Sequence, residues 1–314
     1  MKIHRLLATL LGVWLSSSWG FATANPRWRP VQPGKRKGVS GLAFVNQQGG
    51  TCQFLAVHDN KGDLDQPRLA LLTVPPHGTI QYQPLTWPAD QPLPVDLEAL
   101  TVVPRTQHTE YMAVTSLGQI YHVRLDSPTH TLTVLRSLQI PPHSKLINIE
   151  GFALQQMEDQ LMAVWAHRGE EEDPAMLFWG SVDLTTDKIA VQGSRSWRVP
   201  WPLNQVRHVS DLQIAPDGTL YITAASDPGD QGPFQSAMYV LGRFPFLPSL
   251  SRRAAPSEGP DPSTLVPLYR FGFNKVEALA LIPGQNGGIV WASDDEKFGS
   301  ALAGQCHATP QSME

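Results

Sequence analysis

One short pattern returns five times along this chain of 314 residues, and it restricts the possible fold more than any other feature. In each copy a β-branched residue or leucine is followed by Ser or Glu, then by a small residue or Asp, and then by Leu or Phe. The copies are GVSGLAFV, DLEALTVV, NIEGFALQ, HVSDLQIA and KVEALALI. Their shared large apolar residues, spaced by 58, 52, 60 and 67 positions, are Leu42, Leu100, Phe152, Leu212 and Leu279. Self-similarity at such spacings indicates a repeated structural unit.

A second strand-like segment follows each copy at a nearly constant distance. These segments are FLAVHD, YMAVTS, LMAVWAH, LYITAASD and GIVWASDD. Turn residues such as Pro216-Asp217-Gly218 separate the two segments, so each pair is predicted to form a β-hairpin. Additional strand-like segments, for example RLALLTV and TIQYQPLTW in the first unit, bring each unit to about four antiparallel strands.

Units of four strands at this spacing are typical of a β-propeller, whereas a β-sandwich would explain the strands but not their repetition. The last unit contains little strand sequence beyond ALAGQCHA, and an unassigned segment, RWRPVQ, precedes the first unit. We therefore predict an all-β propeller with five blades of four antiparallel strands, closed by an N-terminal strand that completes blade five. The 28 prolines agree with a fold that is rich in turns.

The N-terminus has the form of an export signal. Lys2, His4 and Arg5 precede the apolar stretch LLATLLGVWL, and Ala22-Thr23-Ala24 supplies small residues for a signal peptidase. We predict a signal peptide at residues 1–24, a single propeller domain at residues 25–314 and a proline-rich insertion at about residues 245–267. The apolar stretch is short for an uncleaved anchor, the alternative reading. The mature protein is thus expected in the periplasm or outside the cell, with no membrane span.

The charge balance disfavours one class of partner. The formal net charge is −4, and it becomes −6 when Lys2 and Arg5 are removed with the signal, because the first 24 residues contain no acidic group. A negative surface is not expected to bind nucleic acid. A small molecule or a protein partner is the remaining expectation.

The repeat also predicts where a site lies. In a hairpin, the start of the first strand and the end of the second lie at the same end of the sheet. Because the innermost strand of every blade lines the central channel, all five strand starts should gather around one mouth. Acidic residues there, predicted as metal ligands, are Glu98, Glu150 and Glu277. Other polar residues there, predicted to bind a ligand, are Ser40, Asp59, Asp211, Asp227 and Asp294. The candidates for a catalytic proton carrier are His58 and His167.

The strand form E-G/A-L/F-A, with a second strand that ends in HDN or SDDE, resembles the phytase-like propellers that are associated with esterase-like activity. Related exported bacterial propellers of unknown function share it. The resemblance covers most of residues 38 to 300. It implies an exported propeller of a group that is often associated with calcium, and calcium also suits an acidic, oxygen-rich site.

Three functions are compatible with these residues. The first is a propeller that binds a ligand, an ion or a protein partner at its acidic mouth. The second is a metal-dependent hydrolase, a phosphoesterase or an esterase or lactonase, in which the metal activates water and His58 or His167 moves a proton. The third is a propeller in which calcium is purely structural. The sequence has no Gly-x-Ser-x-Gly elbow, no phosphate-binding Gly-x-x-x-x-Gly-Lys loop and no paired-histidine zinc motif, which favours binding over catalysis.

Cys52 and Cys306 are the only two cysteines. An exported protein with an even number of cysteines is expected to pair them. Cys306 belongs to the late part of blade five and Cys52 opens the second strand of blade one, so a disulfide between them would lock the ring at its closure. Two free thiols are the alternative.

Overall fold

The computed structural model describes residues 26–304 and residue 306, apart from residues 36, 105, 107–108, 127, 142–147, 246–264 and 285–286. The predicted signal peptide at residues 1–24 lies outside the described residues, as does most of the predicted insertion at residues 245–267. Among the described residues, no helix has the length and apolar character needed to cross a membrane.

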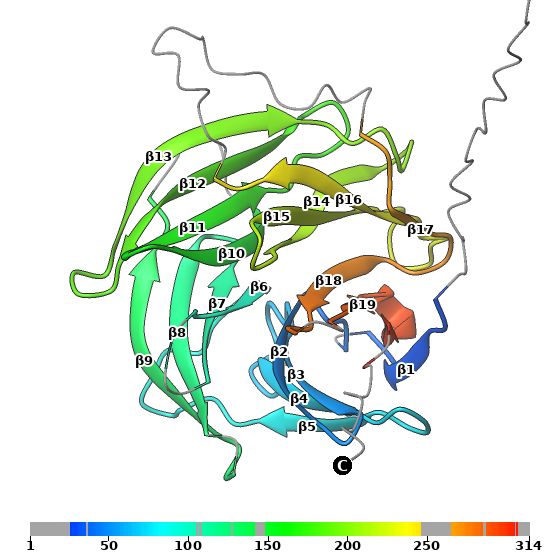
Figure 1. Cartoon of the computed structure of the whole chain (residues 1–314). Helices are drawn as coiled ribbons and strands as arrows, with labels where there is room; N and C mark the ends of the chain where they lie inside the picture. The colour runs from blue at the N-terminus through cyan, green and yellow to red at the C-terminus, as the bar shows by residue number, and fades with distance from the viewer. Residues whose placement is uncertain are drawn as a thin grey trace, which may run out of the picture.

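Five antiparallel sheets of four strands surround a central channel (Figure 1). The innermost strands of blades one to five are β2 (Gly41–Gln48), β6 (Leu97–Val102), β10 (Ile149–Met157), β14 (Val206–Ile214) and β18 (Val276–Leu281). The second strands are β3 (Thr51–Val57), β7 (Glu110–Thr115), β11 (Gln160–His167), β15 (Thr219–Ser226) and β19 (Ile289–Ser293). The third strands are β4 (Leu69–Val74), β8 (Gln119–Asp126), β12 (Ala175–Asp183), β16 (Ser236–Arg243) and β20 (Ser300–Gly304). The outermost strands are β5 (Gln81–Leu85), β9 (Thr131–Gln139), β13 (Lys188–Trp197), β17 (Tyr269–Phe271) and β1 (Arg29–Gln32). The predicted fold class is confirmed.

The ring closes as predicted, because β1 pairs with β20 and becomes the fourth strand of blade five. Arg29 on β1 also reaches into blade one, where its guanidinium donates to the backbone oxygen atoms of Pro75 at 2.7 Å and Gly78 at 2.8 Å. Cys52 on β3 forms a disulfide with Cys306, just beyond β20, and their Cα atoms are 6.0 Å apart. Strand pairing, side-chain bonds and a covalent link therefore all join the two ends of the chain.

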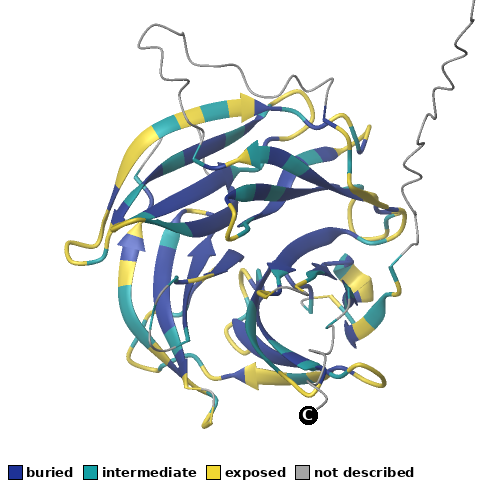
Figure 2. Cartoon of the chain, in the orientation of Figure 1, coloured by how far each residue is buried: buried dark blue, intermediate teal, exposed yellow. Residues whose placement is uncertain are grey.

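The hydrophobic core lies between the blades, and Figure 2 shows that exposed residues gather on outer strands such as β13. Five clusters of buried apolar side chains occupy the five interfaces between neighbouring blades. Each cluster contains one shared apolar residue of the repeat, and these residues are Leu42, Leu100, Phe152, Leu212 and Leu279. Each of them packs against the preceding blade around the ring, so the repeat marks the residues that hold neighbouring blades together.

Candidate functional site

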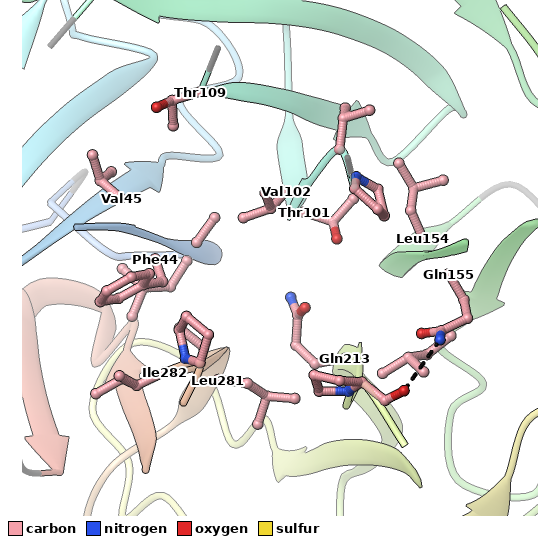
Figure 3. A pocket seen from close by; sticks show the side chains of 18 of the residues that line it. Phe44, Val45, Thr101, Val102, Thr109, Leu154, Gln155, Gln213, Leu281 and Ile282 are labelled. Carbon is pink, nitrogen blue, oxygen red and sulfur yellow. Dashed lines mark hydrogen bonds between the residues drawn. The ribbon is translucent and has the colours of Figure 1, made fainter. Parts of the chain in front are cut away.

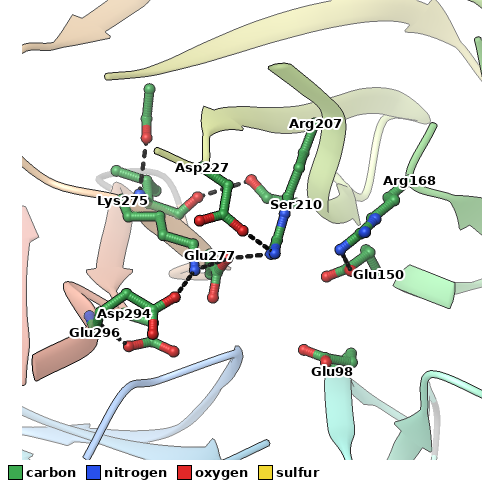
Figure 4. Close-up of polar contacts among 12 residues, drawn as sticks. Glu98, Glu150, Arg168, Arg207, Ser210, Asp227, Lys275, Glu277, Asp294 and Glu296 are labelled. Carbon is green, nitrogen blue, oxygen red and sulfur yellow. Dashed lines mark hydrogen bonds and ion pairs between the residues drawn. The ribbon is translucent and has the colours of Figure 1, made fainter. Parts of the chain in front are cut away.

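The three glutamates of the repeat occupy the same local structure in three blades. Glu98, Glu150 and Glu277 each interrupt the pairing register between the innermost strand and the second strand, as the extra residue of a β-bulge. A bulge turns a side chain out of the regular alternation. In Figure 4 the three carboxylates lie around one end of the channel, as the repeat predicts.

We call this end the charged mouth. Its acidic residues are Asp59, Asp96, Glu98, Glu150, Asp227, Glu277 and Asp294. Its basic residues are Lys61, Arg168, Arg207 and Lys275. The four cations lie close enough to the carboxylates to form ion pairs, so the mouth is a mixed-charge network instead of a purely acidic one.

Cations neutralise most of the mouth on the side of blades three to five. Glu277 lies 3.1 Å from both Arg207 and Lys275. Arg207 also pairs with Asp227. Glu150 lies 3.5 Å from Arg168. Two of the predicted metal ligands, Glu150 and Glu277, are therefore already paired with basic side chains.

On the side of blades one and two, three carboxylates converge with less compensation. We call Asp59, Asp96 and Glu98 the carboxylate trio, because one oxygen atom from each lies within 4.8 Å of the others. The trio shares only Glu98 with the set of metal ligands predicted from the repeat. Lys61 Nζ lies 3.0 Å from Asp96 Oδ1 and 3.9 Å from Glu98 Oε1, and its side chain is 63% exposed.

The position of Asp96 shows how tightly the trio is built. The Ser116 hydroxyl donates to its Oδ2. Its Oδ1 is buried and accepts no hydrogen bond from the described part of the chain, although Lys61 is close. Asp96 also has a φ of 64°, a left-handed conformation that Asp tolerates better than most residues. The ammonium of Lys61, 3.0 Å away, is therefore the charge that compensates the buried Asp96 Oδ1.

Burial and crowding favour the protonated forms of several carboxylates here. Burial, with Glu150 and Asp96 nearby, raises the pKa of Glu98 well above its usual value. Burial also raises the pKa of Glu150 to about 7, and the pKa of Asp59 is raised by burial and by the charge of Glu277. Only Asp227 shows the reverse, because the charges of Arg207 and Lys275 outweigh its burial and lower its pKa.

The structure argues against His58 as a proton carrier. Its Nδ1 bonds to the backbone oxygen of Gly38 at 2.5 Å, and its Nε2 lies 3.1 Å from the Tyr82 hydroxyl on the outermost strand of blade one. Burial lowers the pKa of His58 to about 4. Both ring nitrogens are engaged and the ring is neutral at physiological pH, so His58 supports the fold and the catalytic prediction for it is corrected.

His167 differs from His58. Its Nδ1 lies 3.1 Å from the backbone oxygen of Asn148, and burial lowers its pKa as well. The residue is only half-buried. The other ring nitrogen, Nε2, has no hydrogen bond to the described part of the chain, so His167 stays a candidate.

Asp211 is a structural residue and not a ligand of the mouth, contrary to the prediction. It is fully buried, and its two carboxylate oxygens accept hydrogen bonds from the backbone N–H groups of Leu212 and Leu279, each at 2.6 Å. The second bond links blade four to blade five. Ser40 is also buried, and its hydroxyl has no hydrogen-bond partner among the described residues.

Sequence reasoning missed Asp96 and three of the four cations, which are Lys61, Arg207 and Lys275. Asp96 and Lys275 are the first residues of their copies of the repeat, DLEALTVV and KVEALALI, so a comparison of first positions would have found them. Lys61 lies in the loop after the second strand of blade one. Arg207 enters the mouth because the register shift in blade four is longer and extends from Arg207 to Asp211. No pattern in the sequence predicts this longer shift.

Comparisons with known proteins identify the class of the fold. No protein-family model matches the chain, and no curated protein matches it. The structure is similar to an endo-1,4-beta-xylanase from Bacteroides thetaiotaomicron, with a TM-score of 0.50, 11% identity and coverage of 87% of this chain and 91% of that chain. It is also similar to a mutant alpha-L-arabinanase from Cellvibrio cellulosa, with a TM-score of 0.50, 12% identity and coverage of 86% and 92%.

At these identities the likeness shows the fold alone. The chain is a five-bladed β-propeller whose structural neighbours include propellers of the arabinanase type. The resemblance to phytase-like propellers stays a prediction from its motifs.

Proposed function

We propose that this protein is an exported binding propeller that holds a divalent cation, calcium in the first place, at the carboxylate trio, and that the cation and the charged mouth together bind a small molecule or a protein partner. The observation that carries the proposal is the convergence of Asp59, Asp96 and Glu98 within 4.8 Å. These residues come from two blades, so the ring itself holds them together.

The donor set fits calcium. Carboxylate oxygens are the ligands that hard cations prefer, and the charge that faces the buried Asp96 Oδ1 is the ammonium of the largely exposed Lys61. The raised pKa values of Glu98 and Asp59 reflect burial and repulsion between carboxylates. A divalent cation would remove that repulsion and favour the ionised forms.

Lys61 supplies a competing positive charge. Its ammonium lies near both Asp96 and Glu98, and its largely exposed side chain is free to move into solvent. Lys61 should therefore weaken cation binding without preventing it. Substitutions of Lys61 and of Glu98 should therefore change calcium affinity in opposite directions.

Calorimetric titration of the mature protein with calcium tests the proposal. We expect one site with a Kd on the order of 10⁻⁴ to 10⁻³ M, the range of extracellular calcium modules. Glu98→Gln should weaken binding by about tenfold or more, because it removes a ligand charge, whereas Lys61→Gln should strengthen it several-fold. The control is Glu172→Gln, since the Glu172 side chain is 94% exposed and, among the described residues, its ion pair is with Arg198.

Thermal melts provide the second readout. Calcium should raise the Tm of the wild type and chelator should reverse the effect, with the same order among the variants. The metal would be removed from the proposal by three results together. These are no calcium uptake, the same Tm with and without chelator, and the same Tm response to calcium in all three variants.

A hydrolase at the same mouth is the second candidate, and the pKa of Glu150 favours it. A carboxyl group with a pKa of about 7 is suited to general acid–base catalysis near neutral pH. With His58 engaged in the fold, Glu150 and His167 are the candidates for the proton carrier, and the trio with its cation would activate water.

Two sets of substrates follow from the similarities. The xylanase and the arabinanase suggest glycosides, and the phytase-like motifs suggest phosphate esters and other esters or lactones. Turnover of nitrophenyl arabinosides, xylosides, phosphate or a simple lactone, lost in Glu150→Gln, would support this candidate. Calcium binding without any turnover leaves the binding function.

A further inference from the structure

The opposite end of the channel carries a cavity of about 770 Å³ (Figure 3). All five innermost strands run from the charged mouth to this end, and all five contribute residues to the lining of the cavity. Phe44, Val102, Leu154, Ile214 and Leu281 represent the five strands. We call this end the apolar mouth. Its volume falls within the range of small-molecule pockets.

The chemistry of the apolar mouth is unlike that of the charged mouth. The described residues that line it are aliphatic residues, prolines, one phenylalanine, threonines and glutamines, without any ionisable side chain. A charged ligand would lose its hydration there without gaining a counter-charge, which is costly. The described part of the lining therefore favours an uncharged ligand.

One amide stands at the centre of this apolar surface. At the position after the shared apolar residue, three copies of the repeat have alanine and a fourth has Thr101, whereas blade four has Gln213. Figure 3 shows the Gln213 side chain between the surrounding strands. Its Nε2 donates to the backbone oxygen of Leu100 at 3.1 Å, from blade four to blade two, so it spans the channel.

Only half of this amide is used. Gln213 Oε1 accepts no hydrogen bond from the described residues, and the Thr101 hydroxyl, which also lines the cavity, forms none with them. A polar group in apolar surroundings is stabilised by a partner. Gln213 Oε1 is an acceptor and the Thr101 hydroxyl is a donor and an acceptor, so together they match a ligand hydroxyl group.

We propose that the apolar mouth is a second ligand site, which takes an uncharged, mainly apolar small molecule with one hydroxyl group, bonded to Gln213 and Thr101. The site is distinct from the function proposed for the charged mouth, because none of the residues that line the cavity belongs to the charged mouth. A small molecule fits better than a protein partner, since the cavity is concave and lies on the axis of the ring.

A fluorescence titration with the neutral probe N-phenyl-1-naphthylamine tests this site. We expect saturable binding of one probe molecule per chain, displaced by 1-decanol at least tenfold more effectively than by decanoate. Val102→Trp, at a residue that is 40% exposed and lines the cavity, should weaken probe binding at least tenfold. The matched control is Val191→Trp, on outer strand β13, where the valine is 49% exposed and does not line the cavity.

A second variant tests the polar contact. Gln213→Leu keeps the volume but removes the acceptor, so the probe should still bind while displacement by decanol weakens about fivefold. Near-ultraviolet circular dichroism confirms that each variant is folded. The proposal is overturned if the probe does not bind, if Val102→Trp binds it like the wild type, or if decanoate competes as well as decanol. If the protein forms a concentration-dependent dimer that excludes the probe, the apolar mouth is an interface with a second copy of the chain, and the proposal is likewise overturned.

Discussion

The burial of Glu150 makes the stability of the folded protein depend on pH. Its pKa is raised to about 7 in the folded protein, against an ordinary value near 4.5 in an unfolded chain. Between these values the folded protein retains a proton that the unfolded chain has released. The stability contributed by this group is therefore present below about pH 4.5 and is lost as the pH rises to about 7.

Replacing Glu150 should reduce this dependence. A shift of this size corresponds to about 3 kcal/mol, because each pKa unit is worth about 1.4 kcal/mol. In urea unfolding at pH 4.5 and pH 7, without calcium, the free energy of unfolding of Glu150→Gln should fall less with rising pH than that of the wild type. Glu172→Gln is the exposed control and should follow the wild type. An identical pH profile for Glu150→Gln would mean that the carboxyl group titrates normally.

Innermost strands of neighbouring blades pack closely against each other, and small residues on them make this close packing possible. A Cβ atom on Gly151 would lie 2.6 Å from Leu212 Cβ, and one on Gly41 would lie 2.9 Å from the backbone nitrogen of Leu100. In blade four the same position is Asp211, which uses the close approach for a hydrogen bond to Leu279. The small-residue position of the repeat therefore faces the following blade, while the large apolar residue faces the preceding one.

Adding one methyl group at this interface should be costly. Gly151→Ala forces the strands of blades three and four apart, with an expected loss of about 1 to 3 kcal/mol in the free energy of unfolding. Gly62→Ala is the matched control, because nothing lies within 4 Å of the added Cβ atom. Urea unfolding curves measure both variants. Equal stability of the two would show that the blades adjust freely at their interfaces.

At the scale of the whole molecule, the closure between blades five and one is a distinctive interface. It joins segments from the two ends of the chain, and the disulfide between Cys52 and Cys306 spans 254 positions. Such a link restricts the unfolded chain strongly. Arg29 adds hydrogen bonds from β1 to blade one. The ring is thus secured at its closure by strand pairing, by the buried apolar cluster between blades five and one, by these hydrogen bonds and by the disulfide.

Removing the disulfide should weaken the whole ring. The Cys52→Ala/Cys306→Ala double variant should lose roughly 5 kcal/mol in the free energy of unfolding, because the chain-entropy model gives about 5.5 kcal/mol for a loop of this size. A reducing agent should lower the Tm of the wild type and leave the double variant unchanged. Thiol titration of the unfolded, unreduced wild type should find no free thiol, and two free thiols would refute the bridge.

Much of this architecture was predictable because it depends on local patterns that repeat. Five copies of one strand motif defined five blades, the extra segment RWRPVQ indicated the closing strand, and the positions of Glu98, Glu150 and Glu277 within the motif placed them at one mouth. Equivalent residues of a repeat are related by the rotation of the ring, so one pattern specifies all of them.

The partners of each side chain were decided only by the tertiary structure. The strand pattern placed Asp59, Asp211 and His58 near one mouth. In the structure, Asp59 joins the carboxylate trio and Asp211 accepts hydrogen bonds from two backbone N–H groups. His58 contacts Tyr82 on the outermost strand of blade one. Contacts of a few ångströms between different blades depend on bulges, rotamers and loop paths. The strand pattern determines which end of the channel a residue occupies, but these distances determine whether it binds, pairs or packs there.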